Sequence, residues 1–384
     1  MKIVYCIAAT HNAGGMERVL ANKVNYLVAR GHELYIITTD QQEKHSFFFL
    51  DKRVRLYDLG INYCDNQDNA VLRKVWQYKR KQHKHKKALT ELLISIGPDI
   101  TISMFDHEVS FLWRIPDSSK KIVEIHFSRF KRLQYGRSGL LGILDKWRSH
   151  QDKIWAEKYA QFVVLTEEDK TYWGNMENIA VIPNANSFLP DVQATLTNNR
   201  VIAVGRYDYQ KGFDELIQAW ALIDKTFSDW SLHIFGKGPL KGALLDLIAK
   251  LGLKRSVFLE DPVIDIRHQY INSSVLAMTS RYEGLPMALL EAQVCGLPMV
   301  AYACKCGPRD IIQEGKNGFL IEEGDRISMA NRLQQLMLDS ELRIRMGSES
   351  TRLSANFSED MVMNKWLDLF HQLHSPPSLD LDKN

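Results

Sequence analysis

Residues 2–31 read KIVYCIAATHNAGGMERVLANKVNYLVARG, and this stretch decides the fold class. It begins with an apolar run, continues into a loop with two adjacent glycines, and then repeats apolar residues at helical spacing up to Gly31. The pattern predicts a buried strand, a loop and an amphipathic helix that ends at the glycine. A strand followed at once by a helix is the repeating unit of a parallel α/β sheet.

The same unit recurs along the chain and starts afresh after residue 184. In the first half, strands are predicted at 2–9, 34–39, 54–59, 100–104, 122–125 and 162–166, and helices at 16–30, about 70–96 and 140–158. In the second half, strands are predicted at 201–204, 232–235, 257–259, 275–279 and 298–301, and helices at 213–223 and 240–251. We therefore expect an α/β protein of two Rossmann-like domains whose parallel sheets face each other across a cleft.

The domain boundaries follow from this restart. We place an N-terminal domain at residues 1–183 and a C-terminal domain at 184–356, because 384 residues suffice for two domains. A last helix at about 359–373 is expected to pack back on the first domain, and 375–384 to form a flexible tail. Ligands of open parallel sheets bind beyond the carboxyl ends of the strands, so the loops there are the place to look for a site.

The composition is that of an ordinary globular protein, with 45% hydrophobic and 25% charged residues. No apolar run approaches the ~18–20 residues that span a bilayer, and the N-terminus reads as a first strand rather than a signal peptide. The five cysteines have neither disulfide nor zinc spacing. These features predict a cytoplasmic protein.

The charge is unevenly distributed between the two halves. Residues 1–183 contain 28 Lys and Arg against 21 Asp and Glu, whereas the remainder contains 21 against 25. Much of the excess lies at Arg73, Lys74 and 79–87, with a second cluster at 129–137. A basic, partly amphipathic helix predicts contact with an anionic surface, either phospholipid head groups or a pyrophosphate-linked acceptor. The alternative is a solvated helix face; nucleic acid is not expected, because no binding module accompanies the charge.

The stretch TSRYEGLPMALLEA at 279–292 carries the strongest functional signal. It follows a predicted strand and opens a helix, with Pro286 placed as a first-turn proline. The backbone amides expected to point outward there are those of Leu285, Met287 and Ala288. Such a helix start suits a diphosphate. Glu291, inside the helix, can accept hydrogen bonds from ribose hydroxyls, and Glu283, in the loop, from hexose hydroxyls; the alternative is two solvated glutamates with no ligand.

Glu283 and Glu291 have seven residues between them, within Glu-Gly-Leu-Pro-Met…Glu-Ala. This stretch closely resembles the signature of the retaining GT-B glycosyltransferases of family 4, the group 1 enzymes of capsular and O-antigen-type polysaccharide biosynthesis. The resemblance extends over nearly the whole chain, and it implies that the domain at 1–183 binds the acceptor and the domain at 184–356 binds the nucleotide-sugar. Further matching motifs are Gly205-Arg206 with Lys211-Gly212, the loop 14–18, the loop 235–239, and Asn184 in the interdomain linker.

The resemblance implies a set of site residues. The donor-binding residues would be Gly14, Gly15, Gly205, Arg206, Lys211, Gly236, Glu283, Gly284, Leu285, Pro286, Met287 and Glu291. The catalytic residues would be His126, Glu283, Arg206 and Lys211. Arg206 and Lys211 are suited to neutralising a diphosphate leaving group without a metal. His126 would contact the transferred sugar. Each of these residues also has a purely structural alternative: His126 could be a hydrogen-bonded histidine at a strand end, Gly14 and Gly15 a tight turn, and Arg206 and Lys211 a surface pair.

The implied reaction moves a hexose or N-acetylhexosamine, expected to be UDP-linked, to a hydroxyl of a glycan or a polyprenyl-diphosphate-linked acceptor with retention. No cofactor and no metal are expected, since the Asp380-Leu-Asp382 pair falls in the terminal tail. The enzyme would be peripheral on the inner face of the plasma membrane. The alternatives are a nucleotide-sugar epimerase or phosphorylase on this fold and a non-catalytic sugar-binding protein. A dinucleotide oxidoreductase is disfavoured, because neither glycine loop gives G-x-G-x-x-G.

Overall fold

The computed structural model describes residues 1–65, 71–131, 139–223, 225–263 and 265–374. The predicted tail at 375–384 and the part of the second basic cluster from Arg132 to Arg137 lie outside the described residues. The chain divides into two compact units. Unit 1 comprises residues 1–165, 170–182 and the chain from Met363, and unit 2 comprises residues 166–169 and 183–362.

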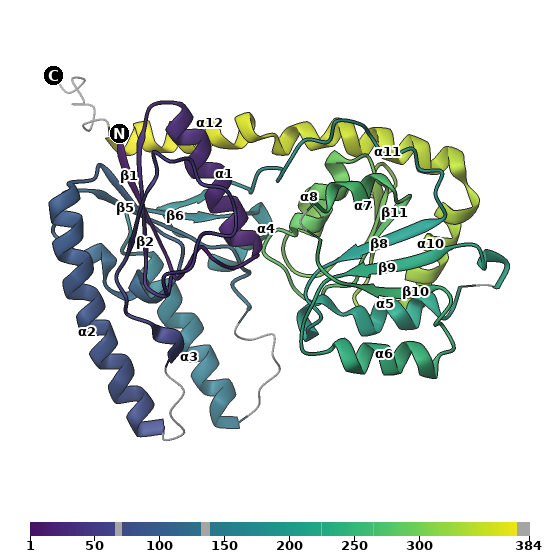
Figure 1. Ribbon diagram of the computed structural model, residues 1–384, viewed down its shortest axis with the longest axis horizontal. Helices are drawn as coiled ribbons and strands as arrows, with labels where there is room; N and C mark the ends of the chain where they lie inside the picture. Colours follow the sequence, from purple (N-terminus) through teal and green to yellow (C-terminus); the bar gives the residue numbers. More distant parts are fainter. Residues whose placement is uncertain (66–70, 132–138, 224, 264, 375–384) are drawn as a thin grey trace. The chain divides into compact units, whose positions relative to one another are not determined.

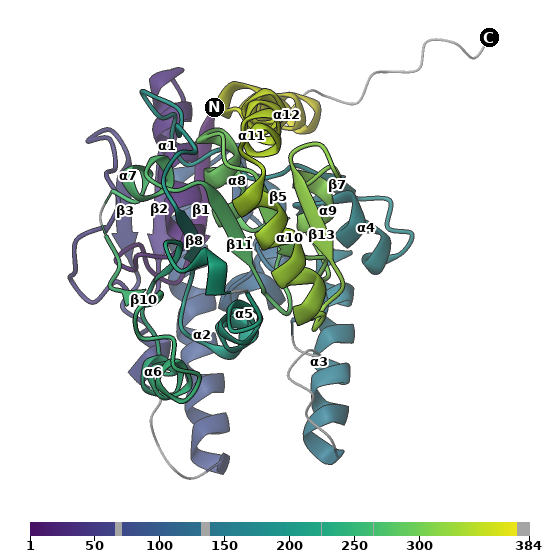
Figure 2. The ribbon, with the colours of Figure 1, turned by 90° about the vertical axis from the view of Figure 1, so that its right-hand side faces the viewer.

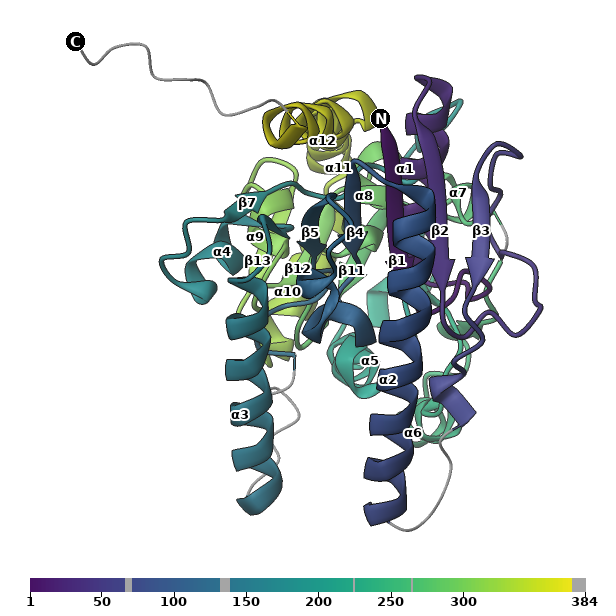
Figure 3. The same ribbon diagram turned by 90° about the vertical axis from the view of Figure 1, so that its left-hand side faces the viewer.

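Unit 1 contains a seven-stranded parallel sheet in the order β3-β2-β1-β4-β5-β6-β7 (Figures 1 and 3). Its strands are β1 (Lys2–Ile7), β2 (Glu33–Thr38), β3 (Arg55–Asp58), β4 (Ile100–Ser103), β5 (Lys120–Glu124), β6 (Gln161–Val164) and β7 (Ile179–Val181). The central strand β1 lies between β2 and β4 and buries nearly all its side chains. Burial on both faces explains why its sequence is a continuous apolar run rather than an alternating one.

Helices cover both faces of this sheet. The helices are α1 (Gly15–Ala29), α2 (Val71–Ile96), α3 (Gly139–Ala156), α4 (Glu167–Trp173) and α12 (Glu359–His374). α2 contributes Leu89 and Leu93 to the core on one face, where α3 contributes Ala156. α1 lies on the opposite face, and Nζ of its Lys23 is 4.0 Å from the centre of the Trp366 ring in α12. Only the later turns of α2 are packed on the sheet; its first turns extend past the carboxyl ends of the strands (Figure 3).

Unit 2 contains a six-stranded parallel sheet in the order β10-β9-β8-β11-β12-β13. Its strands are β8 (Arg200–Val204), β9 (Ser231–Phe235), β10 (Val257–Glu260), β11 (Val275–Met278), β12 (Met299–Tyr302) and β13 (Gly318–Ile321). Its helices are α5 (Phe213–Trp220), α6 (Lys241–Lys250), α7 (Arg267–Ile271), α8 (Met287–Val294), α9 (Pro308–Ile311), α10 (Arg326–Leu338) and α11 (Ser340–Ser354). α5, α6 and α10 share one apolar core with the sheet, and α7 and α8 lie on the other face (Figures 1 and 2).

The predicted α/β class with two Rossmann-like parallel sheets is confirmed. Every predicted strand is present to within a few residues, but β7 and β13 were not predicted. β7 has only three residues, next to the segment that we assigned to the linker. β13 begins with Gly318, where any other residue would place its Cβ 2.2 Å from the Met299 carbonyl oxygen. This constraint comes from a distant part of the chain, so the local sequence does not reveal it.

Candidate active site

Two strand-end loops of unit 2 meet where the strand order reverses. β8 and β11 are adjacent in the sheet, and their loops lead into α5 and α8. A crevice at such a reversal is the usual ligand position in open parallel sheets. Thr279 joins the two loops, because its hydroxyl donates to the carbonyl oxygen of Gly212 at 2.8 Å.

Three glycines make the close approach of these loops possible. Gly212 has a φ of +61°, and a Cβ there would lie 2.2 Å from the Thr279 carbonyl oxygen. A Cβ on Gly236 would lie 1.8 Å from the Gly205 carbonyl oxygen, so the loops after β8 and β9 touch through their backbones. Gly205 lies under the side chain of Lys211, whose methylenes are 3.0 Å from a Cβ position on Gly205. Any side chain at Gly236 would therefore displace the loop that carries Lys211.

Lys211 and Glu283, predicted from separate motifs, form an ion pair. Lys211 Nζ donates to Glu283 Oε1 at 2.7 Å, and the two side chains are 19% and 7% exposed. The Glu283 backbone N–H donates to the Lys305 carbonyl oxygen at 3.3 Å, which fixes the loop from the other side. A lysine and a carboxylate thus face the same point at the carboxyl end of the sheet.

Arg206 does not join this pair. Its side chain is 73% exposed, and among the described residues its guanidinium contacts Asp208 at 3.0 Å and Gln210 at 3.4 Å instead. The predicted phosphate-binding pair of Arg206 and Lys211 is therefore one half-buried lysine and one solvent-exposed arginine. The long arginine side chain can still reach an anion above the loop.

The start of α8 is organised much as the sequence predicts, with one correction. The helix begins at Met287, so Pro286 is its N-cap, with extended backbone angles of φ −72° and ψ 106°, and not a residue of its first turn. The N–H groups of Leu289 and Leu290 both donate to the Pro286 carbonyl oxygen. The N–H groups of Met287 and Ala288 therefore have no intrahelical acceptor, which is the arrangement that favours anions.

The loop after β12 packs against the start of α8 through Gly307. Gly307 has a φ of +96°, and a Cβ there would meet the Pro286 ring at 2.3 Å and the Gly284 carbonyl oxygen at 3.1 Å. Leu285 is buried at the same place. The position of the 283–287 backbone thus depends on a tight contact with the loop after β12.

Glu291 is buried inside α8, where a tyrosine holds it. The Tyr270 hydroxyl donates to Glu291 Oε2 at 3.0 Å, and the tyrosine is fully buried. This hydrogen bond fixes the carboxylate orientation. The sequence analysis missed Tyr270, since nothing in the local pattern of α7 links it to a residue 21 positions later.

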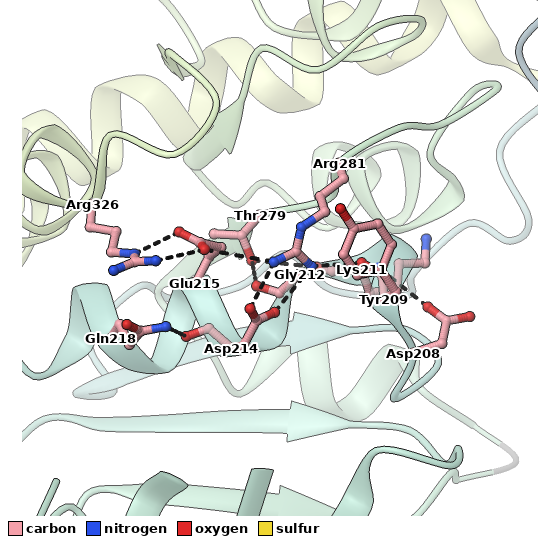
Figure 4. Close-up of polar contacts among 10 residues, drawn as sticks. All are labelled: Asp208, Tyr209, Lys211, Gly212, Asp214, Glu215, Gln218, Thr279, Arg281 and Arg326. Atoms are coloured by element: carbon pink, nitrogen blue, oxygen red, sulfur yellow. Dashed lines mark hydrogen bonds and ion pairs between the residues drawn. The ribbon is translucent and has the colours of Figure 1, made fainter. Parts of the chain in front are cut away.

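A network of charges connects the two loops, and the sequence analysis missed it as well (Figure 4). Arg281 donates to both carboxylate oxygens of Asp214, at 3.1 and 2.7 Å, and to the Tyr209 carbonyl oxygen at 2.7 Å. Its guanidinium also lies 4.3 Å from the centre of the Tyr209 ring. Arg326 holds the neighbouring Glu215 through bonds of 2.6 and 2.8 Å. Arg281 thereby fixes the loop of Lys211 relative to the loop of Glu283.

Replacing Arg281 by alanine should lower kcat/KM by about 10- to 100-fold, because displacement of a catalytic loop by about 1 Å costs up to this much. Arg281→Lys should retain only part of the activity, since a lysine cannot make the two parallel bonds to Asp214. The measurement is steady-state sugar transfer alongside thermal unfolding. Arg332→Ala, which removes an arginine outside this network, serves as the control; if it has the same effect as Arg281→Ala, the positioning role is wrong.

In unit 1, the predicted glycine loop leads into α1. Gly14 is the N-cap of the helix and Gly15 its first residue. A Cβ on Gly14 would lie 2.2 Å from Glu17 Oε2, so the carboxylate of Glu17 folds back over the glycine. Burial raises the pKa of Glu17, whereas Asn12 and the nearby His11 and His126 oppose this shift. His126 therefore lies within electrostatic reach of the Glu17 carboxylate.

His126 follows β5 and is held by a buried glutamate. Its Nε2 lies 2.7 Å from Glu124 Oε1, and its side chain is 7% exposed. Lys23 of α1 donates to the same oxygen of Glu124. Burial alone would raise the pKa of Glu124, but Lys23 and His126 outweigh it and lower that pKa to about 2. The sequence contains two signals for this pair that the sequence analysis missed. Glu124 is a charged residue in an apolar strand, and Lys23 lies among the buried apolar residues of α1.

The comparison with known proteins agrees with this geometry. Residues 188–352 match the family model described as glycosyl transferases group 1. An uncharacterised glycosyltransferase of Haemophilus influenzae is 29% identical over 374 residues, which are 95% of this chain and 98% of that protein. The amylovoran biosynthesis glycosyltransferase AmsD of Erwinia amylovora is 36% identical over 220 residues, 54% of this chain and 61% of that protein.

A likeness of fold extends over the whole chain. The crystal structure of a point mutant of S. aureus TarM, in complex with fondaparinux, α-GlcNAc-glycerol and UDP, superposes with a TM-score of 0.78 at 18% identity, covering 96% of this chain and 99% of that chain. The chain is thus similar in sequence to the group 1 glycosyltransferases over residues 188–352, and it has the GT-B fold over most of its length.

Proposed function

We propose that this protein transfers a hexose or N-acetylhexosamine from a UDP-sugar to a hydroxyl of a glycan or lipid-linked oligosaccharide, with retention, in surface polysaccharide biosynthesis. The observation that carries the proposal is the Lys211–Glu283 pair at the start of α8, with Glu291 buried in the same helix. The UDP in the TarM complex and the amylovoran pathway of AmsD support the donor and the pathway.

The roles follow from what each group can bind. The N–H groups at the start of α8 and Lys211 receive the diphosphate, whose charge grows as the glycosidic bond breaks. Arg206 adds a second cation from the solvent side, and no metal or cofactor takes part. Glu291, oriented by its hydrogen bond from Tyr270, accepts hydrogen bonds from the ribose hydroxyls. Glu283 accepts hydrogen bonds from hydroxyls of the transferred sugar.

The N-terminal half supplies the acceptor side. His126 contacts the transferred sugar, with its ring held by Glu124, and Gly14 and Gly15 let backbone approach the ligand. The positive charge of this half suits a polyprenyl-diphosphate-linked acceptor at the inner face of the plasma membrane. Among the described helices, none combines the length and the apolar character needed to cross a bilayer.

Substitution of the two glutamates separates the roles. Glu291→Ala should raise the KM for the donor by about 10-fold or more, because it removes hydrogen bonds to a charged acceptor. Glu283→Ala should chiefly lower kcat, since Glu283 contacts the sugar and pairs with Lys211. Initial rates with UDP-, GDP- and ADP-sugars measure both effects and identify the base.

Glu341→Ala is the matched control, because Glu341 is an exposed glutamate at the start of α11. Full activity in both site variants would rule out the site. Conversion of the donor sugar without any acceptor would instead indicate an epimerase, and no response to any donor would contradict the proposed function as a whole.

A further inference from the structure

The first turns of α2 expose large apolar side chains on all sides. Trp76 is 61% exposed and lies opposite the buried stripe of His85, Leu89 and Leu93. Val75 and Tyr78 continue that stripe toward the start of the helix but are also exposed. The core that the later turns cover does not enclose these first turns: the Tyr78 ring lies 5.8 Å from the rings of Tyr63 and His107, but most of the Trp76 side chain remains exposed.

α3 has its polarity reversed. Between residues 143 and 152, before Ala156 enters the core, the residues that it buries are polar, namely Asp145, Ser149 and Asp152. The opposite side of the helix carries Ile143 and Trp147, which are 64% and 57% exposed, with Leu144 beside them. A surface helix of a globular protein normally has the reverse pattern. The outward face of α3 is therefore built for an apolar environment.

The exposed charged residues of α2 between 73 and 90 and of α3 between 139 and 152 are all positive. On α2 the exposed cations are Arg73, Lys74, Lys79, Arg80, Lys84, Lys86 and Lys87, and residues 73–90 contain no Asp or Glu. On α3, Lys146 and Arg148 are exposed, whereas both acidic residues of 139–152 are buried. Arg80 lies 5.7 Å from the centre of the Trp76 ring, so cation and aromatic group are combined on one face.

The two helices point the same way. Both begin at the end of unit 1 that lies beyond the carboxyl ends of the strands, and they run back toward the sheet in roughly the same direction (Figures 1 and 3). Trp76 and Trp147 lie in the second or third turn of their helices. Two basic, tryptophan-bearing helix ends thus project from one side of unit 1.

We propose that these two helix ends dock on a bilayer with anionic head groups, with Trp76 and Trp147 in the boundary between head groups and acyl chains and the cations on lipid phosphates. Tryptophan favours this boundary, and clustered Lys and Arg bind anionic leaflets. Two weak anchors on one rigid unit act together. The docking surface deepens the membrane association proposed above and rests on it, but it does not depend on the donor site.

The test is co-sedimentation of the full-length protein with vesicles of phosphatidylcholine alone or mixed with phosphatidylglycerol. We expect binding to the anionic vesicles to exceed binding to neutral ones by about tenfold or more, and to weaken in high salt. Trp76→Ser with Trp147→Ser should reduce the partition coefficient by roughly tenfold. Arg80→Glu with Arg148→Glu should reduce it by at least as much.

Matched controls lie in unit 2. Leu338→Ser with Ile344→Ser removes two exposed apolar side chains, and Lys250→Glu with Arg345→Glu reverses two exposed cations. Both pairs should bind vesicles as the unmodified protein does. Equal binding to neutral and anionic vesicles, or no binding at all, would overturn the proposal.

Two further outcomes would also overturn it. Retention that depends on the cations but not on the tryptophans would mark a general polyanion surface, such as one for nucleic acid. A concentration-dependent dimer in sedimentation velocity that the tryptophan pair abolishes would mark an interface with a second copy. Turnover of the donor with a soluble acceptor, measured on the same variants, should be unchanged, so that failure of docking and failure of the proposed reaction remain distinguishable.

Discussion

Replacing Lys211 by alanine should lower kcat by about 10²–10³-fold, the usual effect of removing one group that stabilises developing charge. Its ammonium group lies at the start of α8, where the leaving diphosphate is expected, and is held there by Glu283 at 2.7 Å. The loss should appear mainly in kcat, because the charge on the leaving group is greatest in the transition state. Single-turnover kinetics would separate this step from donor binding.

Lys237→Ala is the control, since Lys237 is an exposed lysine on the neighbouring strand-end loop. Circular dichroism should accompany both variants, because the loss of Lys211 leaves Glu283 nearly buried without its cation. A Lys211→Ala protein that is folded and retains its full kcat would show that this lysine has no role in the reaction.

Replacing Lys23 by methionine should lower the free energy of unfolding by about 3–5 kcal/mol at pH 7, the usual cost of removing one partner of a buried ion pair. Both side chains of the Lys23–Glu124 pair are nearly or fully buried. Without Lys23, the Glu124 carboxylate would keep His126 Nε2 at 2.7 Å but would lose the lysine cation that it faces. Urea unfolding would measure the change.

The pH dependence gives this prediction a second test. The pKa of Glu124 is about 2 in the folded protein, against an ordinary value of 4.5. Between these two pKa values, the unfolded chain binds a proton on Glu124 that the folded chain does not bind. The pair therefore stabilises the protein fully above about pH 4.5 and progressively less as the pH falls toward 2. The difference between Lys23→Met and the unmodified protein should therefore shrink in acid.

Changing both partners, Lys23→Met with Glu124→Gln, should recover part of the lost stability, because no buried charge is then left without its partner. If Lys23→Met loses less than about 1 kcal/mol, the pair resembles a solvated surface bridge. If the loss is the same at every pH, Glu124 is not the group responsible.

The local sequence was sufficient for the fold class and for every strand except β7 and β13. Apolar runs such as that of β1 and the glycines that follow β8 and β9 are local signals, and each marks an element that the structure contains. The extended Glu283–Glu291 stretch placed a helix start after a strand for the same reason. What depends on neighbours along the chain could be predicted.

The contacts that hold the site in place could not be predicted. Arg281 contacts Asp214, which is 67 positions away in the sequence, and Lys23 contacts Glu124, which is 101 positions away. Each of these residues looks like an ordinary charge in its own segment, because its partner becomes a neighbour only when the sheet forms. The reversed polarity of α3 was missed for a related reason: its apolar residues have helical spacing whether they face a core or not.

The ion pair between Lys211 and Glu283 has a consequence for which molecules can compete at this point. Lys211 and Glu283 already serve as counterions for each other. Because both belong to the same chain, the effective concentration of one at the other is of the order of millimolar or more. A free phosphate ion that reached Lys211 would displace the carboxylate and leave Glu283, 7% exposed, without a partner. A molecule that brings an anion to the lysine and hydroxyl donors to the glutamate replaces both partners at once. The pair therefore acts as a filter, which discriminates against simple anions and in favour of ligands that carry both kinds of group.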